Sequence, residues 1–108
     1  MANLNTFKNI TANLTSSNTT LYTAPITSTS IILMGQVTNI TSNTADVTFA
    51  LNTVSANTEL VYNLEVPPND AVNVLLGKLV LQNSHSIYAS SSSNNTLKIT
   101  LSVLETLN

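Results

Sequence analysis

The chain has 108 residues, of which 43% are hydrophobic and only 7% are charged, and its formal net charge is −2. This length fits one domain with its own core. Three lysines without any arginine argue against nucleic-acid binding, because phosphates are neutralised by those two residue types. No stretch approaches the roughly 20 apolar residues of a membrane helix, and no basic segment precedes an apolar run at the N-terminus. We therefore expect a product that is made in a cytoplasm and does not enter a membrane.

In chain order, the first six residues show no core pattern and are predicted to form an N-terminal arm, followed by a single domain over residues 7–108. Within that domain, strands are predicted over residues 7–14, 19–24, 31–40, 46–51, 59–66, 72–76, 79–81, 86–89 and 96–105. The run over 72–76 is also compatible with one helical turn. Many short strands with polar turns between them are typical of an antiparallel β-sandwich or a jelly-roll-like barrel. We expect about eight strands and no long helix.

The last predicted strand has the clearest pattern. Leu97, Ile99, Leu101 and Val103 alternate with polar residues. Such alternation indicates a strand with one buried face.

The predicted strand over residues 31–40 differs from the last strand, because its apolar residues lie on both faces. Ile31, Ile32, Leu33 and Met34 are consecutive, so both faces of this strand must be covered.

Residue types that carry chemistry are scarce. His85 is the only imidazole, the five Asp and Glu residues lack the spacing of metal ligands, and cysteine is absent. A serine nucleophile would need a supporting motif such as Gly-x-Ser-x-Gly, which does not occur. We predict no enzyme activity and no catalytic, metal or cofactor site.

Several apolar residues are instead candidates for contact with a partner. Within the run, Ile32 and Met34 alternate with Ile31 and Leu33, so one of these two pairs needs cover beyond the primary core, either by burial within the sheets or from a partner. Leu104 and Leu107 extend the last strand in the same way. The arm could fray, or could pair with a neighbour by strand addition. The candidate partner residues are Asn3, Leu4, Asn5, Phe7, Ile32, Met34 and Leu107.

Five short motifs that follow one another along the chain resemble, as a set, those of a known class of proteins. The set comprises TLYTAP at 20–25, IILMGQVTN at 31–39, VPP at 66–68, GKLVL at 77–81 and LSVLE at 101–105. Together these motifs resemble small virion structural proteins of tailed bacteriophages, including marine and cyanobacterial phages. The chain departs from that pattern at Asn69-Asp70, where glycine is common, and at Ser84-His85-Ser86, where a Gly-Asp turn is frequent. These departures affect turns.

The resemblance implies a virion component that is made in the host cytoplasm. The first hypothesis is a capsid decoration (cement) protein, a homo-oligomer that we expect to be a trimer, which binds the lattice of the major capsid protein and stabilises it. The second is a tail- or fibre-associated adaptor or receptor-contacting module. The third is a small carbohydrate-binding β-sandwich that uses one of its tyrosines, such as Tyr62 or Tyr88.

Overall fold

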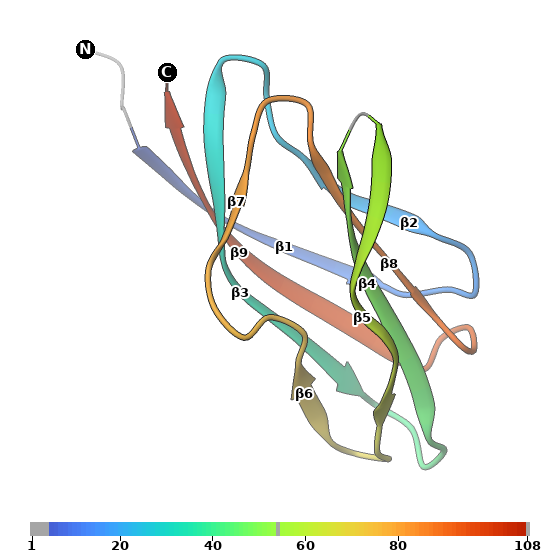
Figure 1. The fold of residues 1–108 in the computed structure, drawn as a ribbon. Helices are drawn as coiled ribbons and strands as arrows, with labels where there is room; N and C mark the ends of the chain where they lie inside the picture. The colour runs from blue at the N-terminus through green and yellow to red at the C-terminus, as the bar shows by residue number, and fades with distance from the viewer. Residues whose placement is uncertain (1–4, 54, 108) are drawn as a thin grey trace.

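The computed structural model describes residues 5–53 and 55–107, and these residues form nine β-strands and no helix (Figure 1). The strands are β1 (Asn5–Asn13), β2 (Thr19–Thr23), β3 (Ser28–Asn39), β4 (Ala45–Thr53), β5 (Ala56–Val66), β6 (Ala71–Asn73), β7 (Leu79–Leu81), β8 (Ser86–Ser91) and β9 (Leu97–Leu107). The all-β prediction is confirmed, and each of the nine predicted ranges overlaps one of these strands. β1 begins at Asn5, two residues inside the predicted arm.

The strands form two antiparallel sheets. In sheet A the order is β1-β9-β3-β6, and β7 also pairs with β3; in sheet B the order is β2-β8-β4-β5. β7 pairs with residues 30–32 of β3 and β6 with residues 36–38. The residues between β6 and β7 therefore leave the sheet and return to it farther along the same strand. Because β6 is only three residues long, the predicted strand over 72–76 ends early.

β9 is the central strand of sheet A. It pairs with β1 on one side and with β3 on the other along nearly its whole length. The predicted alternation is confirmed, since Leu97, Ile99, Leu101 and Val103 are all buried between the sheets. From sheet B, Phe49 is the largest fully buried side chain of the same core.

A β-bulge divides β3 into two halves. The pairing of β3 with β9 shifts register between Ile32 and Met34. An extra residue in one strand of a pair changes which side chains point inward. The buried positions accordingly change from 28, 30 and 32 to 35, 37 and 39.

The bulge explains the run of four apolar residues and corrects one prediction. Ile32 and Met34 do not share a face: Ile32 is 0% exposed and belongs to the core, whereas Met34 is 38% exposed on the opposite side of sheet A. Ile32 is therefore not available to a partner of the folded chain.

Gly35, beside the bulge, allows the segment after β6 to approach β3 closely. The Val74 amide donates to the Gly35 carbonyl at 3.1 Å. A Cβ atom at position 35 would lie 3.0 Å from Val74 Cγ2 and 3.3 Å from Leu101 Cδ2. The missing side chain thus lets the segment after β6 pack against sheet A as it leaves it.

Asn39 joins the two sheets at the end of β3. Its side-chain nitrogen donates to the carbonyl of Asn43 at 2.7 Å and to that of Val66, in sheet B, at 3.0 Å. Its side-chain oxygen accepts from the Thr41 amide and hydroxyl, each at 2.9 Å. Asn39 is only 1% exposed, so these bonds satisfy a polar group that would otherwise be costly to bury.

Candidate interaction surface

A row of four apolar side chains crosses the outer face of sheet A. Phe7 of β1 is opposite Leu104 of β9, Leu104 is opposite Ile31 of β3, and Ile31 is opposite Val80 of β7. Phe7 is 73% exposed and Val80 is 55% exposed, and the two residues between them are partly exposed. We call Phe7, Ile31, Val80 and Leu104 the outer row.

The bulge in β3 enlarges this apolar surface. Leu33 lines a hollow of about 270 Å³ on sheet A together with residues that include Phe7, Asn9 and Ser102. Met34 is exposed beside it. The outer row and the bulge therefore form one apolar area with a shallow depression in it.

The surroundings of the outer row are polar but almost uncharged. β1 contributes Asn5 and Asn9 to this face; Asn5 accepts a hydrogen bond from Thr106 at 2.9 Å, and Asn9 accepts one from Ser102 at 3.2 Å. By register the paired strands present one charged side chain on this face among the residues described, Lys98 near the far end of β9, and Lys8 also lines the hollow. Because few charges must be desolvated, a partner could cover this face at a low electrostatic cost. Such a surface suits contact with a flat apolar and amide-rich partner.

A polar cluster holds the sheets together beneath the same end of sheet A. The Tyr22 hydroxyl, from sheet B, donates to Glu105 Oε2 and lies 2.8 Å from the Ser30 hydroxyl. Lys8 Nζ lies 3.1 Å from Glu105 Oε1. These four groups link β1, β3 and β9 of one sheet with β2 of the other.

The protonation equilibria of this cluster favour a neutral tyrosine and an ionised carboxylate. Burial, together with the hydrogen bond to Glu105, raises the pKa of Tyr22 to about 12. The Tyr22 hydrogen bond lowers the pKa of Glu105; burial opposes this, and Lys8 lowers the pKa further. The cluster therefore acts as a structural link at neutral pH.

The predicted partner residues have three different locations. Asn5, Phe7 and Met34 lie together on the outer face of sheet A, and Ile32 lies in the core. Asn3 and Leu4 lie outside the described residues. The backbone of Leu107 pairs with Ser28, and its side chain is likewise outside the described part.

Sequence reasoning missed most of the outer row. In the sequence, Ile31 is one of four consecutive apolar residues, Leu104 extends the last strand, and Val80 falls within the predicted strand over 79–81. Cross-strand register places these three residues in one row with Phe7, and this register is visible only in the paired sheet.

Other candidate chemistry is sparse in the described part of the chain. No group of three or more His, Cys, Asp and Glu side chains comes together there. Tyr62 is 71% exposed, whereas Tyr88 is 9% exposed and so cannot stack on a sugar. Among the described residues there is also no helix of the length and apolarity that a membrane span requires.

Comparison with known proteins shows a shared fold. No protein-family model and no curated protein matches the sequence. One similar solved chain belongs to the acidic stable capsid structure of Helicobacter pylori bacteriophage KHP30, with a TM-score of 0.58, 11% identity, and coverage of 99% of this chain and 90% of that one. A chain of the Bacillus endospore appendages, described as disulfide-linked pili, has a TM-score of 0.53 and 11% identity, covering 96% and 88%.

A third chain comes from infectious bursal disease virus, Gx strain, with a TM-score of 0.57 and 13% identity. The match covers 98% of this chain but 33% of that one. This β-sandwich is therefore a fold that also occurs in a phage capsid structure, in a virus structure and in Bacillus endospore appendages.

Proposed function

We propose that the protein is a structural component of a virus particle and, more specifically, a decoration protein that binds the outer shell of a tailed phage as a homotrimer. The single observation that supports this best is the outer row with its uncharged surroundings. A protein whose exposed apolar area lies on a broad sheet face is suited to lying against a larger surface.

The likeness to the KHP30 capsid structure supports the same proposal. The matched chain there is only slightly longer than this one, since the match covers 99% of one and 90% of the other. A chain of this size within a capsid structure is consistent with a small accessory component. The motifs that resemble virion proteins of tailed phages point the same way.

The mechanism would be stabilisation by binding. A protein that binds the assembled shell, and not its separated subunits, stabilises the shell by mass action, by about 2.7 kcal/mol per site at one hundred times the dissociation constant. Three outer rows in one trimer would act at high effective concentration and raise the apparent affinity without a new kind of contact.

The experiment adds purified protein to phage shells that lack it, and measures co-sedimentation and the melting temperature of the shells. Protein with Phe7→Ser and Val80→Ser should bind at least about tenfold more weakly, because two exposed side chains of the row lose their apolar contacts. Ile40→Ser is the matched control, because Ile40 is 52% exposed but directly follows the end of β3, nine residues beyond Ile31 and roughly 30 Å away.

The same particles allow a test of location. Quantitative mass spectrometry of purified virions should find many more copies of the protein than of any tail component. A copy number in the range of the tail components would contradict decoration and favour the tail- or fibre-associated role. Equal binding of the row variant and the Ile40 control would contradict the role of the outer row.

A second candidate, an appendage subunit, is favoured by the likeness to the Bacillus endospore appendages. The chain contains no cysteine, so the disulfide linkage that describes those pili cannot form within this sequence. Filaments seen by electron microscopy of the purified protein would favour this candidate over the decoration protein.

A further inference from the structure

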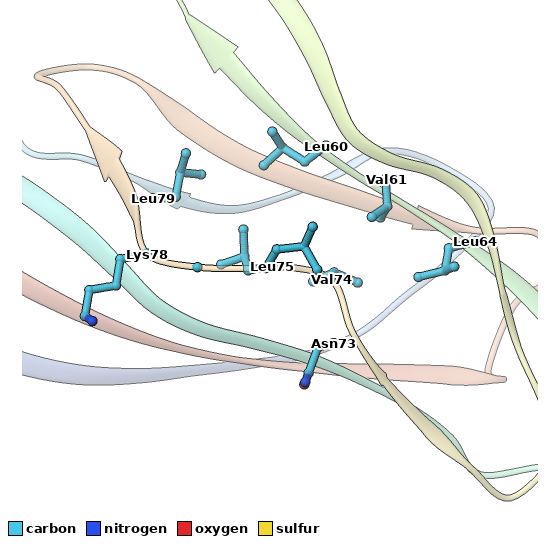
Figure 2. Close-up of a pocket in the computed structure, with 10 residues that line it drawn as sticks. Leu60, Val61, Leu64, Asn73, Val74, Leu75, Lys78 and Leu79 are labelled. Atoms are coloured by element: carbon cyan, nitrogen blue, oxygen red, sulfur yellow. The ribbon is translucent and has the colours of Figure 1, made fainter.

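An apolar groove opens along the edge of the sandwich opposite β1. It lies between β5 of sheet B and the segment that joins β6 to β7, and its volume is about 440 Å³ (Figure 2). Its walls are Leu60, Val61 and Leu64 on one side and Val74, Leu75 and Leu79 on the other. In Figure 2 the labelled residues of β5 lie across the groove from the segment that carries Val74 and Leu75, while Lys78 points away from β5. The groove is thus an unfilled extension of the core.

The same edge carries a fully exposed leucine. Leu76 has a relative exposure of 107% and stands at the rim of the groove, which it lines together with Leu75. An apolar side chain held this far out makes almost no contact within its own chain. One copy of the protein therefore presents both an apolar projection and an apolar recess at one edge.

Opposite charges flank these two features. Glu59 and Glu65 lie exposed on β5, and Lys78 lies exposed on the segment between β6 and β7. The ion pair found among the described residues joins two other side chains, Lys8 and Glu105. An approaching copy would bring its Lys78 toward the acidic residues of β5, and that attraction would favour its correct orientation.

We propose that the groove receives the Leu76 side chain of a second copy of this chain, and that this contact builds the subunit interface of the homotrimer proposed above. Each copy gives its Leu76 to the next copy and receives one in its own groove. Such a head-to-tail contact closes into a ring when the rotation between neighbours is one third of a turn. The outer row lies on a different face and stays free for the shell.

The geometry of β5 favours side-chain insertion over strand addition. β5 pairs with β4 through two register shifts, and Asn63 has a φ of 51°. Bulges and charged residues on an edge strand disfavour pairing with a further strand. A contact between subunits at this edge is therefore made by side chains such as Leu76.

Sedimentation velocity of the purified protein, without any shell, tests the contact. Leu76→Asp should weaken self-association by roughly ten- to a hundredfold, because an apolar side chain no longer leaves water on assembly. Folding should be unaffected, since Leu76 is exposed. Ile40→Asp is the matched control, because Ile40 is exposed but is not part of the groove or of the outer row.

Charge reversal gives a second, independent test. Lys78→Glu alone should weaken assembly, and so should Glu59→Lys combined with Glu65→Lys. All three changes together should restore most of the lost association, because the attraction is re-established with the charges exchanged. Restoration requires that the two walls meet across subunits.

The outcomes separate this inference from the proposed function. A trimer that Leu76→Asp does not weaken, or a native mass spectrum with a small apolar ligand in place of a second copy, overturns the groove contact and leaves shell binding as proposed. A dimer that Leu76→Asp dissociates supports the contact and overturns the trimer. A wild-type monomer at micromolar concentration overturns both the contact and the trimer, and shell binding is then judged from co-sedimentation alone.

Discussion

The bulge in β3 places two apolar neighbours on opposite faces of sheet A, so truncating each of them should have very different effects. Ile32 is 0% exposed, and removing a large aliphatic side chain from a core costs about 2–5 kcal/mol. Met34 is 38% exposed on the outer face, and Met34→Ala should cost less than about 1 kcal/mol. A domain of this size has a total stability of about 5–15 kcal/mol.

These costs are large enough to separate in a melting experiment. One kcal/mol changes the melting temperature of a domain near 100 residues by about 4 °C or more. Ile32→Ala should therefore lower the melting temperature by at least about 8 °C, and Met34→Ala should lower it by less than half as much as Ile32→Ala does. Circular dichroism during heating, with urea denaturation to compare the dependence on denaturant, gives both quantities.

Aspartate at the same two positions sharpens the contrast. Ile32→Asp buries an unpaired carboxylate and should prevent folding, whereas Met34→Asp should fold as the wild type does. Equal destabilisation by the two alanine variants, or a larger effect at Met34, would refute the register shift between these residues. The placement of Met34 on the outer face of sheet A would then also be wrong, because it depends on that shift.

Four further predictions concern other contacts. Gly35→Ala should cost about 1–3 kcal/mol, because the added Cβ would lie 3.0 Å from Val74 Cγ2; an unchanged urea midpoint would show that the neighbouring segment yields freely. Asn39→Ala should cost about 1–3 kcal/mol by removing the bond to the Val66 carbonyl across the sheets, and a smaller loss in the same assay would contradict that bridge. The pKa of Glu105 is lowered from 4.5 in the folded chain, so Glu105 should stabilise the fold above pH 4.5 and lose this contribution as the pH falls through its folded pKa. The stability of Glu105→Gln should therefore fall less in acid than the stability of the wild type. The pKa of Tyr22 is raised from 10.0 to about 12, so Tyr22 should stabilise the fold below pH 10 and lose this contribution as the pH rises through about 12. Tyr22→Phe should remove that alkaline loss of stability. A pH profile of unfolding that either variant leaves unchanged would contradict these assignments.

The sequence alone was sufficient for the fold class and for most strands. Alternation with a period of two is a local property, because neighbouring side chains of any strand point to opposite faces. It located β9 and its four inward residues, and the polar clusters located the turns. The low charge likewise indicated a surface suited to contact, before any contact face could be named.

The position of that face depended on the tertiary structure. Ile31, Ile32, Leu33 and Met34 are equally apolar, so local pattern cannot say which of them is buried. The choice is made by the register of β3 against β9, which joins residues about 70 positions apart in the chain. The same non-local pairing aligns Phe7 with Leu104.

The groove was hidden from sequence reasoning for a related reason. Leu76 and its neighbours form one short apolar run in the sequence, and such a run predicts a buried strand. The run leaves sheet A because β3 is paired at two separate places by β6 and β7, and Gly35 gives the departing chain room to pack. Periodicity reports which residues prefer to be buried, but only the paired strands decide which of them find cover within one chain and which are left for another.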